Sequence, residues 1–318
     1  MLRRIMLFAG LVALIAPAGA SAAKPVVNTG ATVAITPTTA TLNGSVDANR
    51  RKTIYYFDVG LTSAYGANTV ATPAGARANP IAVTAALTEL APATRYHYRL
   101  VAINRDGTSR GARRTFKTKP QPLGVSLGAA PNPVTPPGEP TMLSGQLTGT
   151  NNAGRQVVLQ SNPFPYSQGF ATLGNAQVTD GSGNFSFPVL SLPVSTQFRV
   201  LMPQRPEVVS PIVVVGAAVK VRAYYRKVTR RRHSVSVRFG GAVLPPRDGV
   251  RVLIQKYGVR VGQWITMSDT VARHATSTKS RYRTRVRIYR TGQYRVVAES
   301  QGDYVSGVSR TLKITAPR

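Results

Sequence analysis

The segment Thr38-Thr39-Ala40-Thr41-Leu42-Asn43-Gly44-Ser45-Val46 alternates polar residues with apolar or small ones. Successive side chains of an extended chain point to opposite faces, so this period of two predicts a strand with one face in a core. The same alternation returns at 53–59, 81–87 and 96–104, and Gly, Pro, Asn and Asp bound the runs. Because helical periodicity is almost absent after residue 22, we expect an all-β fold of antiparallel strands.

The chain of 318 residues is predicted to contain three modules of similar size. Pro- or Gly-marked joints occur near residues 119–122 and 216. The resulting lengths of about 100 residues are typical of one immunoglobulin-like sandwich. We expect a first sandwich at 23–119, a second at 123–216 and a third at 217–316.

Internal repetition relates the second and third modules. Gly154-Arg155-Gln156-Val157-Val158-Leu159-Gln160 returns 95 residues later as Gly249-Val250-Arg251-Val252-Leu253-Ile254-Gln255. Gln197-Phe198-Arg199-Val200 returns 96 residues later as Gln293-Tyr294-Arg295-Val296. Two echoes at nearly one offset indicate tandem relatives. The first module has a fainter counterpart in Tyr98-Arg99-Leu100-Val101-Ala102.

Four segments of the first module carry a family pattern: Ala40-Thr41-Leu42-Asn43-Gly44-Ser45-Val46, Tyr55-Tyr56-Phe57-Asp58-Val59-Gly60, Leu87-Thr88-Glu89-Leu90-Ala91-Pro92-Ala93-Thr94-Arg95-Tyr96-His97-Tyr98-Arg99 and Arg114-Thr115-Phe116-Lys117-Thr118. Residues 26–119 resemble a fibronectin type III domain of bacterial surface and secreted proteins. The resemblance implies a tyrosine corner, in which the Tyr96 phenol binds upstream backbone. Gly44 departs from the pattern, because many animal members carry a core Trp on the second strand. The second and third modules resemble bacterial Ig-like repeats only in general.

The N-terminus has the parts of a secretory signal peptide. Arg3 and Arg4 precede an apolar run from Ile5 to Ala16, and small residues follow it. We expect a signal peptide at 1–22, with Ala20 and Ala23 as near alternatives to cleavage after Ala22. An uncleaved anchor is the other interpretation, although the run is shorter than the roughly 20 residues of a membrane span. No second apolar run follows, so we expect a secreted or cell-surface protein with no span after cleavage.

The composition excludes several chemistries. The chain has no cysteine, which excludes disulfides, thiolate metal sites and a cysteine nucleophile. Arginines outnumber lysines 32 to 9, a bias typical of GC-rich bacterial genomes. The hydrophobic fraction of 42% is too high for a disordered chain, so each module should bury its own core.

Candidate catalytic groups are few and scattered. The three histidines lie apart at 97, 233 and 274, whereas acid–base catalysis needs groups within hydrogen-bond reach. Gly124-Val125-Ser126-Leu127-Gly128 matches the Gly-x-Ser-x-Gly nucleophile elbow, which needs a helix after the serine. Prolines at 131, 133, 136 and 137 oppose that helix, so we interpret the match as a linker and first strand. We expect no catalytic residue and no enzyme; a secreted enzyme with an unrecognised site is the alternative.

Two further segments could bind a ligand. Thr179-Asp180-Gly181-Ser182-Gly183-Asn184 could form a calcium loop, but it lacks further acidic ligands, so a hairpin turn is favoured. Trp264, the single tryptophan, could stack on a sugar, although one aromatic in a strand more often packs in a core or at an edge. We therefore expect no metal site and no cofactor. A carbohydrate-binding accessory protein of a secreted enzyme system remains the alternative function.

The positive charge is concentrated in the third module. The net charge, counted as the number of Lys and Arg residues less the number of Asp and Glu residues, is +9 over 24–120, 0 over 121–216 and +19 over 217–318. Arg226 to His233 separates two strand-like runs and should form a hairpin tip that carries Arg230, Arg231 and Arg232. A second set alternates along one strand and should form a row with a spacing of about 6.6 Å: Arg281, Arg283, Arg285 and Arg287.

Such arginines suit a linear polyanion, because guanidinium groups pair with phosphate, sulfate and carboxylate. A solvated strand face that discourages wrong pairing is the other interpretation. Candidate partners are anionic wall polymers, acidic polysaccharide, anionic lipid head groups and extracellular DNA. Sequence-specific nucleic-acid recognition is not expected, because the basic strands carry no aromatic stacking set. We expect a non-catalytic exported binding or spacer protein whose third module contacts a cell-envelope polyanion or another extracellular polymer.

Overall fold

The computed structural model describes residues 23–136 and 138–317. Every regular element in these residues is a β-strand, and the strands form six antiparallel sheets. The fold is therefore all-β, as the alternating pattern predicts. The chain divides into two compact units, one ending at Gln121 and one beginning at Pro122. The predicted signal segment 1–22 lies outside the described residues, and no helix within them is long and apolar enough to cross a membrane.

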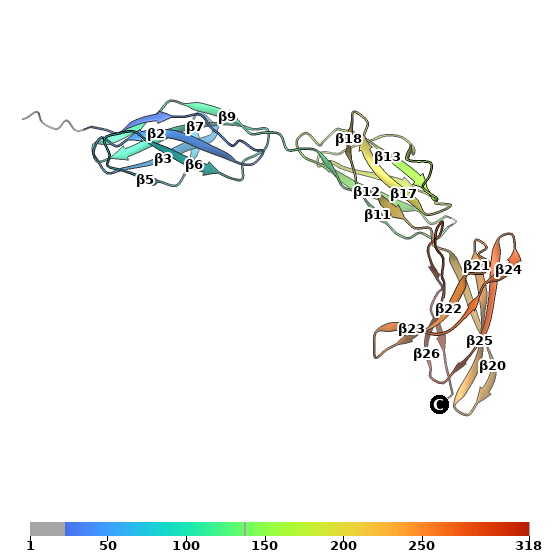
Figure 1. The fold of residues 1–318 in the computed structure, drawn as a ribbon. Coiled ribbons are helices and arrows are strands. Elements are labelled where there is room, and N and C mark those ends of the chain that lie inside the picture. The colour runs from blue at the N-terminus through green and yellow to red at the C-terminus, as the bar shows by residue number, and fades with distance from the viewer. Residues whose placement is uncertain (1–22, 137, 318) are drawn as a thin grey trace, which may run out of the picture. The chain divides into compact units, whose positions relative to one another are not determined.

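The first unit is one sandwich (Figure 1). One sheet has the order β1 (Val26–Thr29), β2 (Ala40–Asp47), β6 (Ile81–Leu87). The other has the order β4 (Tyr65–Asn68), β3 (Thr53–Thr62), β7 (Arg95–Asn104), β8 (Gly107–Arg110), with β5 (Thr72–Gly75) on β3 and β9 (Arg114–Lys117) on β7. Leu42, Phe57 and Leu100 are fully buried between the sheets. A side chain at Gly44 would lie 2.7 Å from Leu100 Cδ2, so Leu100 fills the space beside this glycine.

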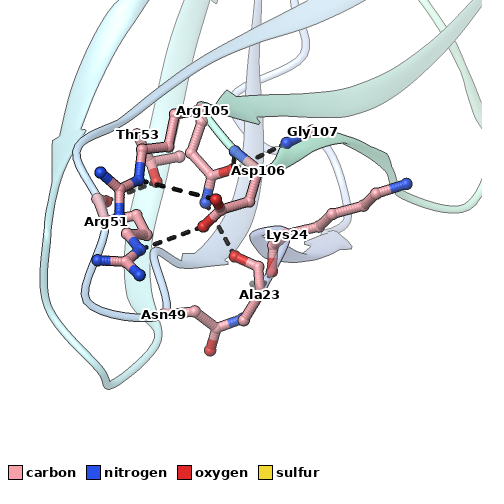
Figure 2. Close-up of polar contacts among 9 residues, drawn as sticks. Ala23, Lys24, Asn49, Arg51, Thr53, Arg105, Asp106 and Gly107 are labelled. Carbon is pink, nitrogen blue, oxygen red and sulfur yellow. Dashed lines mark hydrogen bonds and ion pairs between the residues drawn. The ribbon is translucent and has the colours of Figure 1, made fainter. Parts of the chain in front are cut away.

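The start of the first sandwich is held by side chains of neighbouring turns (Figure 2). The Ala23 carbonyl accepts a hydrogen bond from Asn104 Nδ2 at 3.1 Å, and the Lys24 carbonyl accepts one from Asn49 Nδ2 at 2.6 Å. Asp106 accepts from Arg51 Nε at 3.1 Å in the same cluster.

The second sandwich opens the second unit. Its smaller sheet has β12 (Thr141–Thr148) between β10 (Gly124–Val125) and β11 (Gly128–Ala130), and β16 (Asn184–Val189) also pairs with β12. The larger sheet has the order β14 (Ala171–Thr172), β13 (Gln156–Pro163), β17 (Thr196–Met202), β18 (Arg205–Val209), with β15 (Gln177–Val178) on β13 and β19 (Val213–Val215) on β17. Leu143, Leu159 and Phe198 lie in its core.

The third sandwich carries most of the charge. One sheet has the order β20 (Lys220–Arg231), β21 (Ser234–Leu244), β25 (Lys279–Ile288), β24 (Arg273–Thr276). The other has the order β23 (Gln263–Val271), β22 (Arg251–Gly258), β26 (Gly292–Ala298), β27 (Gly307–Val308), with β28 (Leu312–Ile314) on β26. Phe239, Ile254 and Tyr294 are buried between the sheets.

One side-chain arrangement recurs in the three sandwiches. Arg199 Nε donates to Gln160 Oε1 at 2.8 Å, and its guanidinium lies 4.2 Å from the Phe170 ring centre. In the third sandwich, Arg295 donates to Gln255 at 2.8 Å and lies 4.4 Å from the Trp264 ring. The corresponding set in the first sandwich is Arg99, Asp58 and Tyr65. The sequence echoes therefore mark one structural position on paired strands.

The second and third sandwiches contact each other within their unit. The Ser195 N–H donates to the Asp303 carbonyl at 2.7 Å, and Tyr304 Oη donates to the Pro193 carbonyl at 2.5 Å. Arg247 forms an ion pair with Asp303, and its guanidinium lies 4.3 Å from the Tyr304 ring centre. The predicted boundary at residues 216 and 217 falls at this contact.

Candidate anion-binding face

The four arginines predicted to form a row share one face of β25. Arg281, Arg283, Arg285 and Arg287 are exposed, whereas Tyr282, Val286 and Ile288 between them are buried. This division follows from the strand period, because the apolar residues enter the core and leave the arginines in solvent.

Strand pairing brings further arginines beside this row. Arg285 lies opposite Arg238 of β21, which lies opposite Arg226 of β20. Ala242 separates Arg281 from Arg222 of β20, and Arg281 also lies opposite Arg273 of β24. We call the resulting surface the arginine face: Arg222, Arg226, Arg238, Arg273, Arg281, Arg283, Arg285 and Arg287.

The arginine face has no carboxylate counter-charge among residues 217–317. Asp269 and Glu299 pair with Arg251, and Asp303 pairs with Arg247. Asp248 contacts His274 and Ser280. Since directly opposed like charges destabilise a sheet, the opposed arginines of this face lower the stability of the sandwich.

A groove of about 780 Å³ lies at the end of the face that includes Arg222, Arg273 and Arg281. β21 contributes Gly241, Ala242 and Leu244 to its lining, and the first two have little or no side chain to fill it. A Cβ at Gly240 would lie 2.8 Å from Tyr224 Cζ, so only glycine lets this exposed ring rest on the strand. The groove has cations on both sides, listed by strand as Arg222 of β20, Arg273 of β24, and Lys279, Arg281 and Arg283 of β25.

The predicted hairpin tip lies at one end of the same sheet. Arg230 and Arg231 end β20 and Arg232 occupies the turn, and all three are exposed. An irregularity between Lys227 and Thr229 shifts the register of β20 against β21. The three arginines therefore extend beyond the arginine face rather than add a row to it.

Tyr96 makes the contact expected of a tyrosine corner. Its Oη accepts a hydrogen bond from the Ala91 N–H at 2.8 Å, and its ring stacks on Phe116 with centres 5.5 Å apart. Tyr98, two residues on, is buried and donates to the Gly30 carbonyl at 2.7 Å.

The other motifs have structural environments. Ser126 lies between β10 and β11, where its Oγ accepts from the Gln146 N–H at 3.0 Å, and β11 follows instead of a helix. Asp180 accepts from the backbone N–H groups of Asn184 and Ser182 at 2.8 Å each, and these bonds hold its pKa below the usual value. The Trp264 ring is faced by Arg295. Within the described parts of the chain, no three His, Asp or Glu residues converge on a possible metal position.

No protein-family model matches the chain, and no curated protein matches it. Solved structures with some similarity include a tetra-tandem repeat from the extending region of a large adhesion protein, with 14% identity, 92% of this chain and 75% of that chain covered, and a TM-score of 0.28. A titin fragment is 15% identical, and the match covers 92% of this chain and 99% of the titin chain with a TM-score of 0.38. The FN1–FN3 domains of chicken CNTN1 are 11% identical, and the match covers 93% of this chain and 99% of the CNTN1 chain with a TM-score of 0.24. Superpositions this loose carry no argument about function.

Proposed function

We propose that this chain is an exported, non-catalytic tandem-sandwich protein whose third sandwich binds a linear polyanion of the cell envelope or its surroundings. The observation that carries the proposal is the series Arg226, Arg238 and Arg285, which are directly opposed on three neighbouring strands without a carboxylate partner. A bound polymer with repeated phosphate, sulfate or carboxylate groups supplies the missing counter-charge.

The groove and the opposed arginines beyond it together give the polymer a path across the strands. Arg222 and Arg273 lie on either side of Arg281 at one level of the sheet, and Arg238 lies between Arg226 and Arg285 at another. A flexible chain with charges at intervals contacts several guanidinium groups at once, and its binding should weaken steeply as salt rises.

The binding test compares two double variants with equal loss of charge. Arg283→Ser/Arg285→Ser removes two members of the arginine face, whereas Arg110→Ser/Arg113→Ser removes two exposed arginines of the first sandwich. The chain from Ala23 should bind heparin, a linear polyanion probe, with a steep salt dependence, and should not bind neutral dextran. We expect the first variant to bind at least about tenfold more weakly and the second to bind as the unchanged chain does. Equal binding by both variants would overturn the proposal.

Export is tested separately on the protein recovered from the culture medium of an expressing bacterium. We expect its N-terminal sequence to begin at Ala23, because the Ala-x-Ala sequence Ala20-Ser21-Ala22 precedes it. Retention in the cell fraction with Met1 or Leu2 at the N-terminus would contradict cleavage and favour the uncleaved anchor.

A further inference from the structure

We propose that the free end of the third sandwich inserts the tip of the β22–β23 hairpin into the head-group region of an anionic lipid bilayer. This goes beyond the polymer-binding function, because it uses different residues and a different end of the sheet.

The hairpin tip exposes apolar side chains. β22 pairs with β26 as far as Lys256 and with β23 as far as Gly258, and residues 259–262 extend past these pairs (Figure 1). Val259 is 84% exposed and Val261 is 60% exposed, and Ile265 and Met267 behind them are about half exposed. A hairpin that only connected two strands would gain nothing from valines in these positions.

The apolar side chains line an open groove with a cationic rim. The groove has a volume of about 610 Å³ and lies between the hairpin and the loop from β25 to β26. Val259, Val261, Ile265 and Met267 contribute its apolar part, and Lys256, Arg260 and Arg290 contribute its charges. No carboxylate lines it.

The β20–β21 tip lies at the same end of the sandwich. Val235 of β21 pairs with Ile288 at the end of β25, and the chain then runs through the exposed Tyr289 to Gly292 at the start of β26. Both hairpins thus project from this end, in different directions (Figure 1), one with the exposed Arg230, Arg231 and Arg232 and the other with the valines.

The carboxylates lie away from this end. Asp303 contacts the second sandwich at the opposite end, where Arg247 pairs with it. Glu299 follows β26 at the end remote from Gly292, and Asp269 pairs with Arg251 at the start of β22. The end that is free of the second sandwich is therefore cationic and partly apolar.

This combination matches the chemistry of an anionic membrane surface. Exposed aliphatic side chains enter the boundary between head groups and acyl chains, and flanking arginines and lysines contact lipid phosphates. Charge complementarity thus favours an anionic bilayer over the groove of an uncharged protein as the partner of this hairpin tip.

The test uses the chain from Ala23 and vesicles of phosphatidylcholine with or without phosphatidylglycerol. Trp264 is the only tryptophan and pairs with Tyr257 one position before the tip, so its emission reports insertion. We expect flotation with the phosphatidylglycerol vesicles only, and quenching of Trp264 by brominated acyl chains. Binding without quenching would show a purely electrostatic contact and would overturn insertion.

Two valine variants isolate the tip. Val259→Ser/Val261→Ser keeps every charge and should bind the vesicles at least about tenfold more weakly. Val178→Ser/Val214→Ser changes exposed valines of the second sandwich and should have no effect. Equal vesicle binding by the first variant, or a change in its oligomeric state without vesicles, would overturn the proposal, the latter in favour of a second copy of the chain as the occupant.

Heparin binding separates the two proposals. Val259→Ser/Val261→Ser should bind heparin as the unchanged chain does, because the arginine face is intact. If heparin binding fails for every chain while vesicle binding survives, the polymer function is wrong and the membrane contact stands.

Discussion

Arg238 lies opposite Arg226 on one side and Arg285 on the other, and it is half-buried. Opposed like charges on neighbouring strands destabilise the sheet by about 0.2–1 kcal/mol per pair. Phe239, Val237 and Val286 are buried in the core below, and the burial of these side chains offsets that loss of stability. These opposed arginines therefore lower the stability of the sandwich, and under the proposed function a bound anion would restore it.

Two buried tyrosines set a pH limit on the third sandwich. Burial raises the pKa of Tyr294 to about 12 and raises that of Tyr282 further, with Tyr224 as a lesser cause. Unfolding returns both phenols to a pKa of about 10. Because the folded state holds these protons more tightly, their contribution to stability is complete below about pH 10 and is lost as the pH rises toward 12.

We therefore expect urea unfolding of the chain to show falling stability between pH 10 and 12. Tyr294→Phe should lessen the slope of that fall, and Tyr289→Phe should not, because Tyr289 is exposed. If stability falls with pH at the same slope in the unchanged chain, Tyr294→Phe and Tyr289→Phe, Tyr294 does not release its proton on unfolding.

The paired strands β13–β17 and β22–β26 share one stabilising element. In each pair an arginine bonds a glutamine on the neighbouring strand and covers an aromatic ring. The charge-assisted bond and the cation–π contact together should contribute about 1–2 kcal/mol. The repetition explains why these residues recur in the sequence.

A double-mutant cycle measures this element. Arg295→Ala and Gln255→Ala should each lower the free energy of unfolding, and the double variant should lose less than the sum, with a coupling of about 1 kcal/mol. Arg295→Lys should restore little, because an ammonium lacks the planar fork. Additive losses would mean that the two side chains do not support each other.

At the scale of the second unit, the contact between its sandwiches predicts coupled unfolding. Asp303→Ser/Tyr304→Ser removes the ion pair with Arg247 and the hydrogen bond to Pro193. We expect scanning calorimetry to show a smaller difference between the unfolding temperatures of the second and third sandwiches in the unchanged chain than in this variant. Lys313→Ser, an exposed change at the other end, should leave the transitions as they are. A variant with unaltered transitions would show that the sandwiches unfold independently.

The local pattern of the sequence determined the strands, because a period of two decides which side chains enter a core. It therefore predicted the all-β fold, the exposed row on β25 and the tip at Arg230 to Arg232. The strand β11 follows Ser126 where a nucleophile elbow needs a helix, in agreement with the prolines after it.

Only the tertiary structure decided which charges lie together. Arg222, Arg226, Arg238 and Arg273 join the row through the registers of β20, β21, β24 and β25, and the sequence does not show those registers. Likewise, strand pairing between segments far apart in the chain places the β20–β21 and β22–β23 hairpin tips at the same end as Tyr289. A strand's period is local, whereas the surface that it builds depends on long-range pairing.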